Sequence, residues 1–325
     1  MAHNIPNDTP PPKSNAPPLE SIFWPMTITL SVLFFAIFQV FSWVIHLPPD
    51  PMHHNQLPGF VLLDYIQPTE TDLRGPCPFL NTLANHGYIN RNGADLRTDE
   101  LEKALYRAGL DYYAAKRVHT IVKDGVPLAK EIDNGIYEFT LHDLRNATIQ
   151  HPASLSRSDM PDLSSMQNEE EKVQALQSQS IPDVSRIYDL ISMAHDNPWS
   201  KYKDGSQHTY LDATSIAHHH VNYAQNNSLS WSDIFAMNFE CAILLEVIGR
   251  GGAVNARTLE SVFIHERLPE DWKPAGERIS SSQLFSRSTW CALTWMKVKY
   301  VDVALSRLQG LISRDEKGNA ENDEL

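Results

Sequence analysis

The sequence predicts a mostly α-helical protein, with one helical domain at residues 47–312 behind an apolar N-terminal segment. Apolar residues recur at helical spacing, as at Leu101, Leu105 and Leu110. Few segments alternate polar and apolar residues with the period of two that strands show. The 325 residues suffice for one large domain or two modest ones, and no internal repeat is evident.

The first 45 residues differ in composition from the rest of the chain. Residues 1–20 are polar and rich in proline, which predicts a disordered tail. Residues 22–45 carry no charged side chain, and a helix of this length, at about 1.5 Å per residue, crosses a bilayer. Trp24 and Trp43 lie near its two ends, where membrane helices favour tryptophan. We therefore expect a transmembrane anchor, with a cleaved secretory signal as the alternative.

The flanking sequence favours a single-pass membrane protein whose domain faces the lumen of the secretory pathway. Lys13 precedes the apolar segment and favours a cytoplasmic N-terminus. Asn146 and Asn226 each begin a glycosylation sequence, which suits a lumenal glycoprotein. The terminal residues 322–325 differ by one position from the usual ER-retrieval signals, although residues 313–325 also fit a simple acidic tail. Secretion after signal cleavage is the alternative.

Charge and cysteine content narrow the classes of function. A net charge of −13 argues against nucleic acid as a partner. Three cysteines do not make a disulfide framework. Cys241 and Cys291 lie in apolar helical patterns and are interpreted as packing thiols, with a bridge between them as the alternative.

Within the domain, start and stop signals outline the expected helices. Thr98 is a suitable N-cap for a helix over 99–122, and a short element begins at Leu141. Residues 160–206 are polar and are interpreted as a divergent insertion with a weak helix at 169–177. Further helices are expected over 212–225, 230–248 and 281–312.

The segment 74–88 predicts a helix with a thiol at its N-terminal end. Pro78 suits the first helical position, and Gly87 is a suitable stop. Cys77 then lies where free backbone N–H groups and the positive end of the helix dipole favour a thiolate. Such a thiolate suits a soft metal, haem iron or nucleophilic catalysis, whereas a buried apolar thiol is the alternative.

The run Arg-Gly-Pro-Cys-Pro-x-Leu-Asn-x-Leu-Ala-Asn-His-Gly-Tyr resembles the haem-thiolate chloroperoxidase and peroxygenase family. The resemblance covers about residues 60–275, with a divergent middle. In that family the cysteine between two prolines is the axial ligand of haem iron, which implies haem b bound through Cys77. The resemblance also implies hydrogen peroxide and a small, apolar organic molecule as substrates. Family members include fungal enzymes that tailor secondary metabolites.

Glu240 is the first candidate for proton transfer. It lies in an apolar helical stripe, where burial raises the pKa of a carboxyl group and suits it to move protons near neutrality. By contrast, Glu246 is expected to be solvated and to pair with Arg250 four residues on. The segment also resembles the family helix whose acid–base glutamate lies nine residues before a glycine, here Gly249.

His151 is the second candidate, in a segment that resembles the family run Ile-Glu-His-Asp-Ala-Ser-Leu-Ser-Arg-x-Asp. There the histidine orients the catalytic glutamate, while the Glu and the first Ser bind Mg²⁺ or Mn²⁺ beside a haem propionate. Here Gln150 and Pro152 replace the two acidic residues, and Ser154 is kept. Hard cations favour charged oxygen ligands, so we expect this site to be weakened or lost. We expect a water molecule, or a hydrogen bond from the side-chain amide of Gln150 to the propionate, to take the place of the cation.

Two further histidine-containing segments receive a structural interpretation. The run 265–269, followed by Trp272, resembles another family signature and is interpreted as an ion-paired turn. The triplet 218–220 invites a metal site, but consecutive helical residues point about 100° apart and converge poorly on one ion.

The sequence therefore predicts a haem-thiolate peroxidase or peroxygenase with Cys77 as haem ligand, Glu240 as acid–base and His151 as its orienting partner. Two other classes stay open. Gln150 and Pro152 motivate a haem protein that does not oxidise, such as a cyclase or dehydratase, and a haem-free membrane scaffold is the third interpretation.

Overall fold

A computed structural model describes residues 60–147, 151–160, 163–195, 209–224 and 229–302. The expected tail, the membrane segment 22–45, the acidic tail and Gln150 all lie outside these residues. The chain divides into residues 1–49 and 50–325, and the description below concerns the second part. Across the described residues, no helix has both the length and the apolar character that a bilayer crossing requires.

The mostly α-helical fold class is confirmed for the described part of the chain. The α-helices are α2 (Pro78–Asn85), α3 (Thr98–Arg107), α4 (Tyr112–Gly125), α5 (Glu169–Ser178), α6 (Val184–Ser192), α7 (Ala213–Tyr223), α8 (Trp231–Ile243), α9 (Ala256–Phe263) and α10 (Ser281–Met296). Two 3₁₀ segments, Leu141–Asn146 and Leu163–Ser165, and two π-helical segments, Leu244–Ile248 and Lys297–Asp302, complete the helical structure.

The strands are short and form two small antiparallel sheets. One sheet has the order β1-β3-β2, built from β1 (Leu96–Arg97), β2 (Lys130–Asp133) and β3 (Ile136–Phe139). Leu96 pairs with Phe139 in this sheet. The other sheet pairs β4 (Tyr210–Asp212) with β5 (Ala253–Asn255), with Leu211 opposite Val254. The second sheet joins the start of α7 to the chain that follows α8.

The single helix expected over 99–122 is wrong, because the structure has two helices there. Gly109 has φ +109°, a backbone conformation that residues other than glycine rarely adopt. Asp111 then starts α4 by accepting a hydrogen bond from the Ala114 N–H at 2.6 Å. The break lets α4 fold back onto α3.

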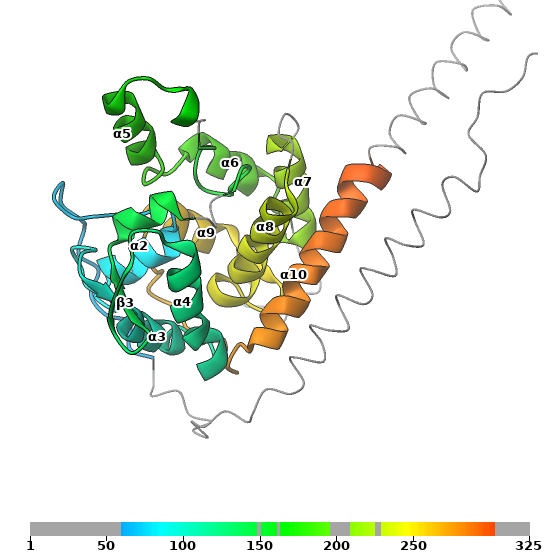
Figure 1. Cartoon of the computed structure of the whole chain (residues 1–325). Coiled ribbons are helices and arrows are strands. Elements are labelled where there is room, and N and C mark those ends of the chain that lie inside the picture. The colour runs from blue at the N-terminus through cyan, green and yellow to red at the C-terminus, as the bar shows by residue number, and fades with distance from the viewer. Residues whose placement is uncertain (1–59, 148–150, 161–162, 196–208, 225–228, 303–325) are drawn as a thin grey trace, which may run out of the picture. The chain divides into compact units, whose positions relative to one another are not determined.

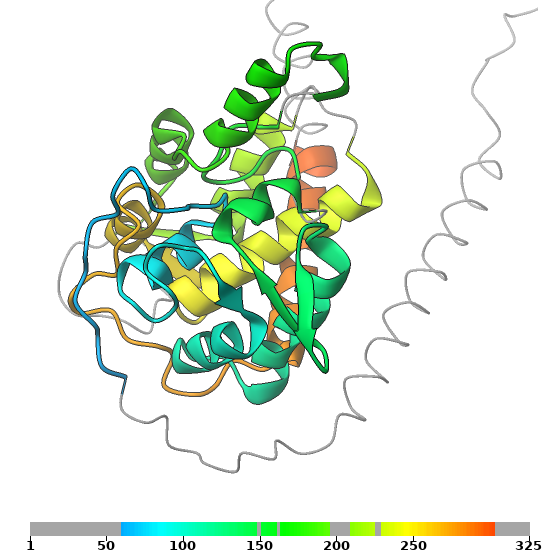
Figure 2. The same cartoon turned by 60° about the vertical axis from the view of Figure 1, so that its left-hand side comes forward.

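The core forms where α8 passes between α2 on one side and α10 on the other, an arrangement visible in both views (Figures 1 and 2). Phe79 and Leu83 of α2 and Leu244 and Leu245 after α8 belong to one buried cluster. Ile187 of α6 is fully buried in the same cluster, so the expected insertion 160–206 contributes to the core. The weak helix expected at 169–177 is present as α5.

A disulfide joins α8 to α10. Cys241 and Cys291 lie with their sulfur atoms 2.13 Å apart and their Cα atoms 6.4 Å apart. The interpretation of both residues as packing thiols is therefore wrong, and the alternative bridge is the one found. Since Cys241 follows Glu240 directly, the bridge fixes the part of α8 that carries the candidate acid–base.

Glu246 is buried, so the prediction of a solvated glutamate is also wrong. Only 3% of the residue is exposed, and its carboxylate accepts hydrogen bonds from Arg287 Nε at 2.5 Å and Gln283 Nε2 at 2.8 Å. Arg287 and Gln283 both lie on α10, so this buried ion pair is a second link between α10 and the segment after α8.

Candidate active site

Local bonds fix Cys77 at the N-terminal end of α2. Cys77 is the N-cap residue, with φ −82° and ψ 108°, and Pro78 follows as the first helical residue. The Asn81 side chain bonds to both backbone polar groups of Gly75, accepting at 3.0 Å and donating at 2.8 Å. A Cβ on Gly75 would lie 2.3 Å from the Leu141 carbonyl oxygen, so only glycine fits there. The chain therefore reaches Cys77 along one fixed path.

The Cys77 thiol is unpaired and half-buried. Burial raises its pKa, while the N–H groups of Leu80 and Phe79 and the Arg157 guanidinium lower it. The N–H groups expected at the helix end are thus present, but burial outweighs them. A bound metal would supply the missing charge, because metal coordination deprotonates a thiol. The Glu240 carboxylate raises the same pKa, which puts Cys77, Arg157 and Glu240 in one electrostatic environment.

Arg157 is a site residue that sequence reasoning missed. It is 1% exposed, and its Nη2 lies 2.7 Å from Glu266 Oε1. Glu266 Oε1 also accepts a hydrogen bond from Asn81 Nδ2 at 2.7 Å. The turn at 265–269 is thus ion-paired, as expected, but to a partner 109 positions away in sequence. The signal was available, because Arg157 is the arginine of the Ala-Ser-Leu-Ser-Arg run.

Glu240 projects from α8 toward the loop that follows His151. Its Oε2 lies 3.5 Å from His151 Nε2, and its Oε1 accepts from the Ser154 hydroxyl at 3.3 Å. The Leu155 N–H donates to Oε2 at 3.2 Å. Burial raises the pKa of the carboxyl group, whereas His151, Leu155 and Ser154 lower it. The structure thus brings Glu240, His151 and Ser154 together.

The second ring nitrogen of His151 determines how protons are shared with Glu240. Nδ1 lies 3.0 Å from the Pro152 carbonyl oxygen, and a carbonyl only accepts, so the Nδ1 proton points there. Nε2 faces the carboxylate. Nε2 and the Glu240 carboxyl group therefore attract each other when one proton lies between them, bound either to Nε2 or to the carboxyl group.

The histidines of the triplet 218–220 serve the fold. His219 and His220 are buried, and burial lowers their pKa values to about 4 and about 3. His219 Nε2 donates to the Arg186 carbonyl at 3.2 Å, and His220 Nδ1 donates to the Ala153 carbonyl at 2.9 Å. His218 is exposed. Across the described ranges, no three His, Cys, Asp or Glu side chains converge as a metal site.

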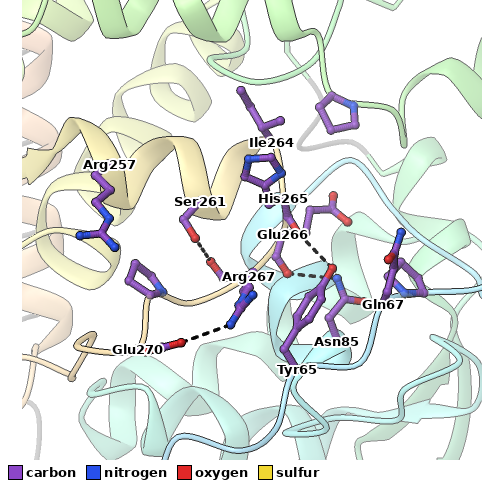
Figure 3. A pocket seen from close by; sticks show the side chains of 13 residues that line it. Tyr65, Gln67, Asn85, Arg257, Ser261, Ile264, His265, Glu266, Arg267 and Glu270 are labelled. Atoms are coloured by element: carbon purple, nitrogen blue, oxygen red, sulfur yellow. Dashed lines mark hydrogen bonds and ion pairs between the residues drawn. The ribbon is translucent and has the colours of Figure 1, made fainter.

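A surface pocket of about 750 Å³ lies beside the 265–270 turn (Figure 3). Tyr65, Asn85, Arg257 and Arg267 are among its lining residues, and Asn85 Nδ2 donates to the Glu266 carbonyl at 3.0 Å. Cys77, Glu240 and His151 do not line it. The pocket therefore excludes these three residues, although Glu266, which lines it, binds Arg157.

The comparison with protein families agrees with a site that has a cysteine between two prolines and a buried glutamate in its electrostatic environment. A family model described as "Peroxidase, family 2" matches residues 63–277. The chain belongs to this family. The resemblance to chloroperoxidases and peroxygenases that residues 74–88 indicated is thereby confirmed.

Curated members of peroxidase family 2 match the chain over short stretches. A chloroperoxidase of Leptoxyphium fumago is 44% identical over 55 residues, which is 17% of this chain and 13% of the relative. An aromatic peroxygenase of Cyclocybe aegerita is 45% identical over 51 residues, 14% of this chain and 13% of the relative. A dothistromin biosynthesis peroxidase of Dothistroma septosporum is 69% identical over 47 residues, 14% of this chain and 11% of the relative.

The residues at the α2 end fit the haem that this peroxidase family implies. An unpaired thiol at a helix N-terminus, kept between two prolines, is a suitable axial donor. Arg157 Nε is buried and has no hydrogen-bond partner among the described residues. Its N–H group could therefore donate a hydrogen bond to an anionic group of the cofactor. The divalent cation of the family fits less well, because Pro152 has no side-chain oxygen and the Ser154 hydroxyl points to Glu240.

Proposed function

We propose that the protein is a haem-thiolate peroxidase or peroxygenase that uses hydrogen peroxide to oxidise or oxygenate an organic substrate in secondary metabolism. One observation carries the proposal: the Cys77 thiol and the Glu240–His151 pair lie in one electrostatic environment, on α2 and α8 respectively. A soft metal ligand and a buried acid–base are the two protein groups that such chemistry needs.

Cys77 would hold the haem iron through its sulfur. Thiolate-ligated haem supplies the electron density that favours cleavage of the peroxide O–O bond. The thiol loses its proton when it ligates, and the N–H groups of Phe79 and Leu80 then stabilise the anion. The fixed path through Gly75 and Asn81 keeps the sulfur in place.

Glu240 would take a proton from hydrogen peroxide and return it to the departing oxygen. Burial keeps the pKa of its carboxyl group above the ordinary value, which favours the uptake of a proton by the carboxylate. His151 shares the transferred proton through Nε2, while its Nδ1–H stays on the Pro152 carbonyl. The Leu155 N–H and the Ser154 hydroxyl stabilise the ionised carboxylate before it takes the proton and again after it returns it.

The proposed substrate is a small apolar organic molecule, and the relatives suggest an aromatic one. One of the named relatives is described as an aromatic peroxygenase, and another is a biosynthesis peroxidase. The Cys241–Cys291 disulfide supports an oxidising compartment, which is consistent with a secreted or lumenal protein. We propose that residues 22–45 direct the chain there, as an anchor or as a signal.

The deciding experiment combines a spectrum with turnover. Haem-loaded protein, reduced under carbon monoxide, should show the red-shifted Soret band of thiolate ligation, and Cys77→Ser should lose it. Glu240→Gln should keep that band and lose about 100-fold or more in peroxide-dependent oxidation. A Cys77→Ser spectrum identical to that of the wild type would exclude Cys77 as the haem ligand. A normal spectrum without peroxide-dependent turnover would favour a non-oxidising haem protein.

A further inference from the structure

Arg186 binds three oxygen atoms of the loop that supports Glu240. Its Nη1 lies 3.1 Å from the Ser154 carbonyl oxygen, 2.6 Å from the Arg157 carbonyl oxygen and 2.7 Å from Asp159 Oδ1, so its two N–H groups are shared among three acceptors. These acceptors span loop 153–159, and Asp159 Oδ1 also accepts the Ala153 N–H at 2.8 Å. One guanidinium group therefore ties together the two ends of the loop.

The guanidinium group of Arg186 is itself held rigidly. It is 7% exposed, and it lies over the Tyr223 ring at 4.3 Å from the ring centre. Asp183, the N-cap of α6, lies 3.7 Å from Arg186 Nε. A buried, paired and stacked arginine loses little further freedom when it binds the loop, so it is a firm support.

Loop 153–159 needs such support. Ala153 has φ +58°, a left-handed conformation that costs free energy in a residue with a Cβ atom. His220 donates to its carbonyl group, and the Leu155 N–H two residues on donates to Glu240. The conformation that aims the Leu155 N–H and the Ser154 hydroxyl at Glu240 therefore depends on bonds from outside the loop.

Among the described residues, several oxygen atoms of this loop that could bind the divalent cation implied by the family resemblance already have hydrogen-bond partners, whereas Gln150 lies outside the described residues. The Ser154 hydroxyl donates to Glu240, and the Ser154 carbonyl accepts from Arg186. Asp159 Oδ1 is occupied by Arg186 and the Ala153 N–H. Pro152 has no side-chain oxygen. The positive charge that would organise the loop is present as a guanidinium group.

We propose that Arg186 is a positioning residue that holds loop 153–159 against Glu240 in place of a divalent cation, so that the holoenzyme requires no Mg²⁺ or Mn²⁺. The role in Glu240 chemistry rests on the proposed function, whereas independence from a divalent cation does not. Arg186 acts through the loop and does not itself touch the reacting atoms.

The first test needs no turnover. The melting temperature and Soret band of the haem-loaded wild type should be unchanged by dialysis against EDTA and by later addition of Mg²⁺ or Mn²⁺. Arg186→Met should lower the melting temperature in both conditions. A wild-type protein that loses stability or haem in EDTA, and regains it with Mg²⁺ or Mn²⁺, would overturn the proposal.

The second test separates positioning from simple stability. In the pH profile of the peroxide-dependent rate, Arg186→Met should shift the acidic limb to higher pH by about one unit. The reason is that Glu240 loses donors that stabilise its carboxylate. Arg186→Lys should restore most of the wild-type limb, since it keeps a buried positive donor. Arg287→Lys, which weakens the distant Glu246 ion pair, should lower the melting temperature and leave the limb unmoved.

The outcomes of the two tests are distinguishable. An unmoved limb in Arg186→Met would contradict the positioning role even if that variant is less stable. If Arg186→Met does not fold, the EDTA test on the wild-type protein decides, and a loss of stability or haem in EDTA that Mg²⁺ or Mn²⁺ reverses would refute the proposal. A wild-type protein that shows no peroxide-dependent turnover but keeps its stability in EDTA would contradict the proposed function. It would still support the role of Arg186 in place of a divalent cation.

Discussion

His151 Nε2 lies 3.5 Å from Glu240 Oε2, although 89 positions separate the two residues. The Nδ1 proton of His151 is committed to the Pro152 carbonyl, so Nε2 is the nitrogen that faces the carboxyl group. Burial raises the pKa of Glu240 and the His151 charge lowers it. The protonation state of the pair is therefore set by these two opposing effects.

Replacing His151 with Gln should move the acidic limb of the peroxide-dependent rate to higher pH. The loss of His151 removes a group that lowers the Glu240 pKa, so the pKa rises further above its ordinary value and the carboxylate forms only at higher pH. A pH–rate profile measures the shift. His142→Gln is the matched control, since His142 bonds to Arg145 rather than to Glu240, and its limb should stay in place. A His151→Gln limb that coincides with the wild type would contradict the pairing.

Buried histidines should make the protein sensitive to acid. The pKa values of His219 and His220 are about 4 and about 3 in the fold, while the unfolded chain binds their protons near the ordinary value of 6.5. Because the unfolded state binds more protons below pH 6.5, stability falls as pH falls from 6.5 toward these folded values. Each histidine contributes ~1.4 kcal/mol per pH unit in that window.

Urea unfolding of His220→Asn at pH 7, 6 and 5 checks this effect. The asparagine keeps a donor for the Ala153 carbonyl but does not titrate, so the variant should lose less stability between pH 7 and 5 than the wild type. His218→Asn changes an exposed residue and should follow the wild-type slope. Equal slopes for all three proteins would show that His220 titrates normally.

Local sequence predicted those parts of the site that local structure determines. The start of α2 at Pro78 and the left-handed Gly87 after it follow from signals within ten residues of Cys77. Glu240 is predicted from its apolar helical surroundings and a family motif, His151 from a family motif, and the contact between them is present. Their catalytic roles stay predictions, as does haem ligation by Cys77.

Distant partners were beyond such reasoning. The burial of Glu246, the Cys241–Cys291 bridge and the Arg157–Glu266 pair each depend on which segments pack together in space. Periodicity places a residue on a helix face, but it does not say which helix covers that face. The prediction of one helix over 99–122 failed for a similar reason, because the backbone of Gly109 and Asp111 bonds to the distant Ile279 instead of continuing the helix.

Removing the Glu266 carboxylate charge should be severely destabilising. Glu266→Gln leaves the Arg157 guanidinium uncompensated at 1% exposure, and breaking a buried ion pair costs ~3–5 kcal/mol. The free energy of unfolding from urea titration measures the loss. Glu270→Gln is the control, since its 3.7 Å pair with Arg267 is solvated and should change stability by less than ~1 kcal/mol. Similar losses for both variants would argue against the buried pair.

The Cys241–Cys291 bridge should be detectable by thiol counting and by stability. The unfolded protein should titrate one thiol, Cys77, before reduction and all three cysteines after it. Replacing both bridged cysteines with serine should cost ~2–4 kcal/mol, because the bridge restricts the unfolded chain across 50 positions. Since Cys241 adjoins Glu240, the double variant should lose a larger fraction of its peroxide-dependent turnover than of its bound haem. Three titratable thiols in unreduced protein would rule out the bridge, and melting of the double variant with and without reductant controls for effects on Cys77.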